Sequence, residues 1–253
     1  MTFTAPLICL TFKDYSEHEN IYTITVLIAC GAMLAFALLY GLISRFVNRN
    51  NPKNSLLTTR ELTQAAVCVA LSFGLHILSA AIPFLSIPFF GLQQGGAVTL
   101  ASLAPITIYC FYKGFRKSII VTAALSVLHL LWFPFIVHPL QVVLDYILPF
   151  SIYAIVGLCR NKKLYNYVIL FFAATLIRYG LHVLSGIIFF AEYAVDLGYK
   201  NIVLIYSLAY NSFVLADFVI AVAAGTALAS NRLIKGYLYK KENSTEHSEA
   251  ISY

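Results

Sequence analysis

Residues 164–190 read LYNYVILFFAATLIRYGLHVLSGIIFF, a long apolar run in which Arg178 is the one charged side chain. A helix needs about 20 predominantly apolar residues to cross the hydrocarbon core of a bilayer. The run is long enough, and its length and composition therefore predict a membrane-spanning helix.

The composition of the whole chain agrees with this interpretation. Its 253 residues are 60% hydrophobic and 11% charged, whereas a typical soluble domain is about 45–50% apolar and about 25% charged. A soluble fold of this size has too much surface to cover with so few charges, and a disordered chain is poor in apolar residues. The sequence therefore predicts an all-α integral membrane protein.

Other apolar runs share the character of the first one. The predicted spans are 21–44, 62–82, 96–112, 118–137, 140–158, 164–190 and 202–230. The run at 96–112 is short, which leaves room for a re-entrant loop at its entry. The run at 21–44 is too long for a cleaved signal peptide and follows acidic residues where a signal would carry cations.

The connections between the spans alternate in charge. Most of the 17 lysines and arginines fall in segments 45–60, 113–117 and 159–163 and in the tail after 231. Cations accumulate on the cytoplasmic side of membrane proteins. We therefore expect a plasma-membrane protein with its amino terminus outside and its carboxyl terminus in the cytoplasm.

Three ionisable side chains stand clearly inside predicted spans: Asp145, Arg178 and Asp217. Such groups are costly in a bilayer and usually face a partner or a cavity. Arg178 and Asp217 carry opposite charges at similar depth, and we expect them to pair with each other. No cation is evident near Asp145, so we expect its carboxylate to face a ligand.

The predicted topology brings further polar and aromatic residues into the outer half of the membrane. The candidates come from different spans and are Asp145, Tyr146, His182, Phe190, Tyr206 and Asn211. A carboxylate with aromatic neighbours favours a cationic ligand that contains rings. The alternative is that these groups satisfy one another, with His182 bonded to a neighbouring backbone carbonyl.

Two other features have an open interpretation. Loop 83–97 is uncharged and rich in aromatic residues, proline and glycine, which suits a lid over a pocket or an ordinary interfacial loop. Ala66 and Ala70 lie four residues apart on one helical face, a spacing that allows close helix approach. Alanine is common in membrane helices, so this spacing alone is a weak signal.

Several classes of site are disfavoured by the sequence. The five cysteines are scattered singly, which favours neither a disulfide nor a zinc site, and no metal or cofactor is expected. No phosphate-binding glycine loop is present, so active transport would draw on an ion gradient or on another protein. The two halves show no convincing repeat, which disfavours a transporter built from inverted repeats.

Several stretches together resemble one known family. They are IVHPLQVVLDYILPF (136–150), IRYGLHVLSGIIFFAEYA (177–194), GGAVTLASLAPI (95–106) and the spacing from Tyr206 to Asn211. These stretches look like the thiamine-binding S components of energy-coupling-factor transporters. The resemblance implies a six-helix substrate-binding membrane domain over 60–231.

The resemblance also implies how the rest of the chain is organised. Residues 1–20 would be an extracellular segment, 21–59 an additional transmembrane helix with a basic linker, and 232–253 a cytoplasmic tail. Members of the family capture thiamine from outside and are not enzymes. They dock on a membrane coupling subunit driven by two cytoplasmic ABC-type ATPases.

Residue roles follow from the motifs that match. The implied ligand-facing residues are Asp145, Tyr146, His182, Gly186, Phe190, Tyr206 and Asn211. Phe190 stands where members of the family can carry a tryptophan, and Asp145 is one methylene shorter than the glutamate of the family. Ala66 and Ala70 match the small-residue motif that S components present to the coupling subunit.

Alternative functions remain open at this point. The ligand could be a thiamine precursor such as hydroxymethylpyrimidine. The chain could instead be a self-sufficient ion-coupled transporter with Arg178 and Asp217 as a relay. An intramembrane enzyme using Asp145 and His182 as a general base pair is the least favoured alternative, since no metal set or phosphate-binding cluster accompanies these residues.

Overall fold

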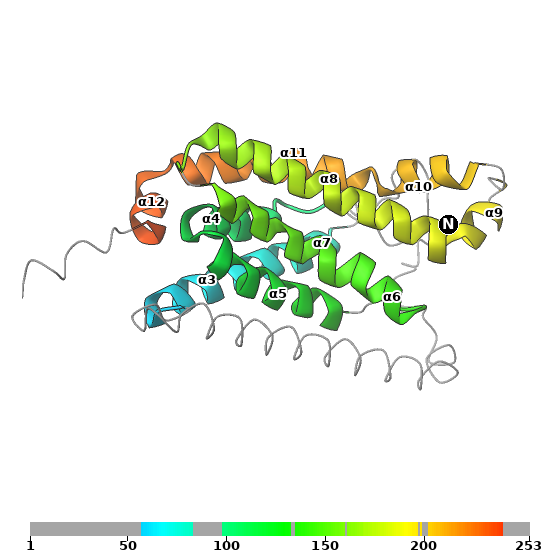
Figure 1. Cartoon of the computed structure of the whole chain (residues 1–253), viewed down its shortest axis with the longest axis horizontal. Helices are drawn as coiled ribbons and strands as arrows, with labels where there is room; N and C mark the ends of the chain where they lie inside the picture. The colour runs from blue at the N-terminus through cyan, green and yellow to red at the C-terminus, as the bar shows by residue number, and fades with distance from the viewer. Residues whose placement is uncertain are drawn as a thin grey trace, which may run out of the picture.

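Helical segments run back and forth between two ends of the molecule (Figure 1). The computed structural model describes residues 57–82, 98–132, 135–159, 161–196, 198 and 202–239. Within them lie α3 (Thr59–Ala80), α4 (Leu103–Lys113), α5 (Phe115–Leu131), a composite segment over 139–158, α8 (Leu164–Phe189), α9 (Ala191–Asp196), α10 (Val203–Asn211), α11 (Phe213–Ser230) and α12 (Arg232–Leu238). The predicted first span at 21–44, loop 83–97 and the tail beyond 239 lie outside the described residues.

Four of the described segments are long and apolar enough to cross a membrane: Thr59–Ala80, Pro139–Leu158, Leu164–Phe189 and Val203–Ser230. Each of them also presents large apolar side chains outward. Leu71, Ile169 and Val219, for example, are all more than half exposed. Contiguous apolar surface is rare on soluble proteins and is what a lipid environment requires. The prediction of an all-α membrane protein is confirmed.

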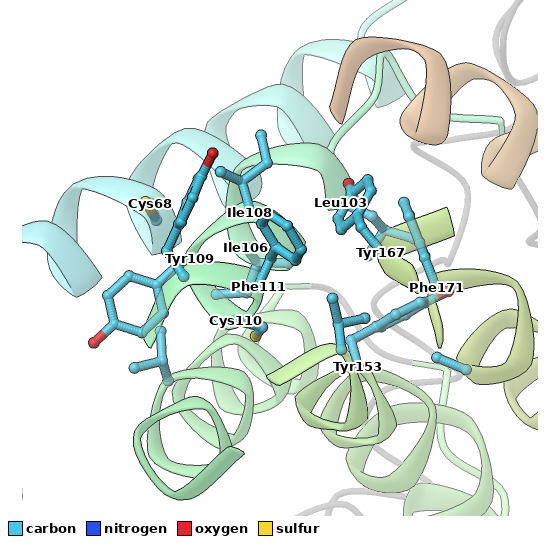
Figure 2. Close-up of a cluster of buried hydrophobic side chains, with 14 of the residues drawn as sticks. Cys68, Leu103, Ile106, Ile108, Tyr109, Cys110, Phe111, Tyr153, Tyr167 and Phe171 are labelled. Atoms are coloured by element: carbon cyan, nitrogen blue, oxygen red, sulfur yellow. The ribbon is translucent and has the colours of Figure 1, made fainter. Parts of the chain in front are cut away.

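Helix α4 lies in the core and is shorter than the predicted span 96–112. It has 11 residues, which at about 1.5 Å per residue covers about half of the hydrocarbon core. Every residue from Leu103 to Tyr112 is buried, as expected for a helix that is apolar all round. Figure 2 shows this cluster, to which neighbouring segments contribute Tyr153, Tyr167 and Phe171. The described part of the predicted span before Leu103 is a turn-like entry rather than helix.

The segment over 139–158 is not one regular helix. It consists of α6 (Pro139–Val142), a π-helical turn η4 (Val143–Ile147), α7 (Leu148–Ser151) and a 3₁₀ helix η5 (Ile152–Leu158). Pro149 has no N–H to offer the carbonyl of Asp145, four residues earlier. The N–H of Leu148 bonds instead to the carbonyl of Val143, five residues back. Such π turns are frequent at functional sites, and this one holds Asp145.

The predicted last span, 202–230, is interrupted at Ser212 between α10 and α11. The Ser212 hydroxyl donates to the carbonyl of Ala209 at 2.7 Å. A serine hydroxyl that bonds back to the preceding turn bends a helix. The two pieces remain nearly continuous, so that α10 contacts α8 at one end while α11 continues along α8 and α4.

Basic connections come together at the end of the bundle where α12 and the beginning of α3 lie (Figure 1). Glu61 bonds to Lys117 at 2.6 Å and lies 3.6 Å from Lys113. The Lys162 ammonium donates to the carbonyl of Phe111. These contacts join the start of α3, the α4–α5 turn and the loop before α8. Since the chain alternates direction, the beginning of α6 and the end of α8 lie at the opposite end.

Candidate functional site

At that opposite end, the Asp145 carboxylate accepts three hydrogen bonds. Gln141 Nε2 donates to Oδ2 at 2.8 Å, Ser185 Oγ donates to Oδ2 at 2.7 Å, and His182 Nδ1 lies 3.1 Å from Oδ1. Gln141 is one turn before Asp145 on the same segment, whereas His182 and Ser185 come from one face of α8 at a spacing of three. The Asp145 side chain remains 16% exposed. Polar donors thus hold the carboxylate without fully enclosing it.

Arg178 lies one turn before His182 on α8, on the side of the His182 ring away from Asp145. Its Nε is 3.4 Å from His182 Nε2, and its Nη1 is 3.5 Å from Asp217 Oδ2. Asp217 also accepts bonds from the backbone N–H and the hydroxyl of Thr99. The predicted pair of Arg178 and Asp217 is confirmed. The alternative in which these groups satisfy one another is also seen, although His182 bonds to Asp145 and Arg178 rather than to a backbone carbonyl.

The close contact of α8 with α10 explains two further candidate residues. Asn211 is buried, and its amide donates to the carbonyls of Ser207 at 2.9 Å and His182 at 3.4 Å. Ser207 Oγ donates to the Val183 carbonyl at 2.9 Å. A Cβ added at Gly186 would lie only 2.3 Å from Ser207 Oγ. Gly186 is therefore the position that lets α10 approach α8 closely beside His182.

Aromatic rings border this polar cluster on two sides. Tyr206 stacks with Tyr210, whose ring contacts Phe213, and Phe213 in turn lies 6.3 Å from the His182 ring. On the other side, the rings of Phe190 and Phe135 lie 6.2 Å apart.

Tyr146 joins the second aromatic group through the backbone. Its hydroxyl accepts from the N–H of Phe135 at 3.0 Å. This bond ties the segment before α6 to the π turn beside Asp145. Of the predicted residues, Asp145, His182 and Asn211 are thus in direct contact. Tyr146 and Phe190 are linked to the cluster through Phe135, and Tyr206 through Tyr210 and Phe213.

Three polar partners of the cluster were not predicted from the sequence: Gln141, Ser185 and Thr99. Two of them carry a recognisable signal. Gln141 stands four residues before Asp145 and Ser185 three residues after His182, positions that share a helical face. Thr99 lies in an irregular segment far along the chain from Asp217, and helical spacing gives no indication of that contact.

Ala66 and Ala70 lie elsewhere, on α3, and both are exposed. They share their face with the outward-facing Leu62, one turn before Ala66. This face is separate from the cluster at Asp145.

A shallow depression of about 360 Å³ lies between η5 and α8, lined by Leu158, Cys159, Asn161, Asn166, Ile169 and Leu170. It has no carboxylate in its lining, and it lies at the end of the bundle with the basic connections. Among the described residues, no group of three His, Cys, Asp or Glu side chains is placed to hold a metal ion. The cluster at Asp145 is therefore the candidate site for a cationic ligand.

A protein-family model described as "Thiamine transporter protein" matches residues 62–235. The chain belongs to this thiamine transporter family. It is 30% identical over 173 residues to the thiamine transporter ThiT of Bacillus subtilis (strain 168), an alignment that covers 63% of this chain and 84% of that protein. The match confirms the resemblance found in the sequence and contains every candidate site residue.

Membership of the family decides between broad classes of function. The family is one of transporters, so the chain is not an enzyme, and the intramembrane-enzyme alternative is excluded. The family and the apolar helices together define a multi-pass membrane protein of thiamine transport.

Proposed function

We propose that the chain captures thiamine from the outside, as the substrate-binding subunit of an ATP-driven importer of the energy-coupling-factor type. The observation that carries the proposal is the Asp145 carboxylate, which stays partly exposed among neutral donors. A carboxylate without a fixed cation attracts a cationic ligand. The orientation follows from the basic connections, which lie at the other end and favour the cytoplasm.

The chemistry of thiamine suits the groups around Asp145. Its thiazolium ring carries a permanent positive charge, which can pair with the carboxylate and stack on aromatic faces. Its aminopyrimidine offers donors and acceptors to His182 and to the hydroxyl of Tyr206. Unpaired buried polar groups disfavour analogues that lack these bonds.

A binding measurement on the purified protein in detergent tests this proposal. We expect saturable thiamine binding at pH 7.5, weakened at least about 100-fold by Asp145→Asn, because charge-assisted hydrogen bonds are the strong ones. Asp196→Asn is the matched control, since Asp196 is an exposed acid of α9 near the same end. No saturable binding below millimolar thiamine would overturn the proposal, and equal affinities for the wild type and Asp145→Asn would remove Asp145 from the site.

The same assay distinguishes thiamine from its pyrimidine half. Hydroxymethylpyrimidine lacks the thiazolium cation, so it gains nothing from charge pairing with Asp145. We expect it to bind much more weakly than thiamine and to be nearly insensitive to Asp145→Asn. Tighter binding of the precursor than of thiamine would identify the precursor as the ligand.

The exposed face of α3 is proposed to contact the membrane coupling subunit. Ala66 and Ala70 present small side chains there, which allow another helix to approach closely. We expect Ala66→Leu/Ala70→Leu to leave thiamine binding unchanged and to abolish ATP-dependent uptake in a reconstituted complex. Ala227→Leu is the control, since Ala227 is an exposed alanine on α11.

The energy source has its own test. Proteoliposomes that contain this chain alone should bind thiamine without accumulating it, and uptake should require the coupling subunit, the ATPases and ATP. Accumulation by the chain alone, driven by an ion gradient, would support the self-sufficient transporter instead.

A further inference from the structure

We propose that Arg178 is a positioning residue that holds His182 in its neutral form with the proton on Nδ1, so that Asp145 keeps its full negative charge for a cationic ligand. The inference rests on the proposed function, since it concerns the charge of the thiamine site. It assigns a role to an arginine that is itself buried and shielded from the ligand side by His182.

The donor and acceptor inventory of the contact defines the proton positions. A guanidinium has five N–H donors and no acceptor. Arg178 Nε points to His182 Nε2 at 3.4 Å, so Nε2 must be the unprotonated acceptor. The remaining imidazole proton then lies on Nδ1, which is 3.1 Å from Asp145 Oδ1 and donates to it.

The guanidinium is fixed in this orientation by several partners. Its Nη1 contacts Asp217 Oδ2 at 3.5 Å and the Tyr153 hydroxyl at 3.4 Å. Its central carbon lies 4.9 Å from the centre of the Phe150 ring. Rotation of Nε away from His182 would disrupt these contacts, so the arginine acts as a rigid donor.

The charged groups around His182 leave the site with a net negative charge. Titratable and charged groups reach this region from the neighbouring elements: Asp145 of η4, Arg178 of α8, Tyr153 of η5, Asp217 of α11, Tyr210 of α10 by way of the Phe213 ring, and, beyond the Phe150 ring, His129 of α5 and His76 of α3. Asp217 neutralises Arg178. Asp145 is then the one unmatched charge among these described groups, provided that His182 stays neutral.

An imidazolium at position 182 would cancel this charge. It would place a cation 3.1 Å from the carboxylate, beside the place where a thiazolium has to bind. Arg178 prevents this because a proton on Nε2 would face the N–H of the guanidinium. The arginine therefore contributes to ligand binding without touching the ligand.

The test uses Arg178→Met/Asp217→Asn in the full-length protein. The double change removes both charges together, which avoids an uncompensated buried charge. His182 Nε2 is then free to take a proton, and an ordinary histidine does so below a pH of about 6.5. The same double variant with His182→Gln added is the control, because it lacks the titrating ring.

Thiamine dissociation constants are measured from pH 8.5 to pH 6. For the wild type we expect less than about a twofold change, because the N–H of Arg178 Nε faces His182 Nε2 and opposes its protonation. For the double variant we expect affinity to fall about fourfold between pH 8.5 and pH 6, since a competing group with a pKa of about 6.5 is mostly protonated at pH 6. The triple variant should bind weakly with a flat profile, and the wild type measured in parallel accounts for ionisation of thiamine itself.

A flat profile for the double variant overturns the inference, whereas absence of thiamine binding by the wild type overturns the proposed function instead. A second readout requires no ligand. Nitrogen-15 NMR of the wild type with labelled histidine, assigned with His182→Gln, should show a neutral ring protonated on Nδ1 at pH 6.5. An imidazolium or a ring protonated on Nε2 would contradict the role of Arg178.

Discussion

Two carboxylates inside the bundle, Asp145 and Asp217, differ in their partners more than in their burial. Asp217 is 1% exposed and faces the guanidinium of Arg178 together with two donors from Thr99. Asp145 is bonded to an amide, a hydroxyl and an imidazole. One acid is compensated by a fixed cation and the other by neutral donors only.

This difference separates a charge that serves the fold from a charge available to a ligand. A buried ion pair leaves an uncompensated charge when either partner is removed, so both members are needed for stability. A carboxylate that is hydrogen-bonded only to neutral donors remains able to pair with a cationic ligand. The two acids should therefore respond to substitution in opposite ways, one through stability and the other through binding.

The largest expected effect is on the stability of variants at Asp217. Asp217→Ala leaves Arg178 buried without its counterion, and we expect a loss of about 3–5 kcal/mol in the free energy of unfolding. Asp145→Ala should cost much less, because its lost partners are neutral and its site is partly exposed. Thermal unfolding in detergent without ligand compares the two. Equal losses would contradict the assignment of one acid to the fold and the other to the site.

Substitution of Asp145 should instead have a large effect on the stabilisation that thiamine gives to the protein. Thiamine at 100 times its dissociation constant should raise the free energy of unfolding of the wild type by about 2.7 kcal/mol. The same thiamine concentration should give Asp145→Asn almost no increase, because its affinity is expected to fall at least about 100-fold. The thiamine-dependent shift in unfolding temperature measures this difference, and Asp196→Asn should shift as the wild type does.

The sequence indicated which residues belong to each region but not how they are connected. Opposite charges at similar depth were enough to predict the pair of Arg178 and Asp217. The π turn at Asp145 and the contact of Thr99 with Asp217 depend on backbone geometry and on packing between distant segments. No helical periodicity encodes these features, although Pro149 in the middle of a predicted span is a local sign of irregular backbone.

The predicted spans were accurate where a segment is regular and exposed to lipid. Residues 164–190 correspond to α8 almost end to end, whereas the helix within 96–112 begins only at Leu103. A helix that faces lipid and a helix that is buried inside the protein are both rich in apolar residues, so composition alone does not distinguish them. A short central helix surrounded by other helices therefore looks like a span in the sequence.

Gly186 tests whether the close packing of α8 against α10 matters for the candidate site at Asp145. Gly186→Ala places a Cβ 2.3 Å from Ser207 Oγ, and overpacking of this kind costs about 1–3 kcal/mol. Gly180→Ala is the matched control on the same helix, with no atom within 4 Å of its added Cβ. We expect Gly180→Ala to be neutral or slightly stabilising, because alanine has the higher helix propensity.

Thiamine affinity should also fall more in Gly186→Ala than in Gly180→Ala if the site requires α10 to stay close to α8. Gly186→Ala should weaken thiamine affinity, and Gly186→Ala/Ser207→Ala should recover part of it, since the clashing hydroxyl is gone. Affinity that is unchanged in Gly186→Ala would show that the spacing of α8 and α10 does not shape the site.

The smallest effect is expected at the other end of the bundle, where charges are paired at the surface. Lys117 bonds to Glu61 at 2.6 Å and its side chain is 30% exposed, and such pairs contribute about 0.2–1 kcal/mol. Lys117→Met should therefore lower stability by at most about 1 kcal/mol, less so in high salt because salt screens exposed charges. Thiamine affinity should not change. A loss of affinity in Lys117→Met would mean that the basic end communicates with the site at Asp145, and that the two regions do not act independently.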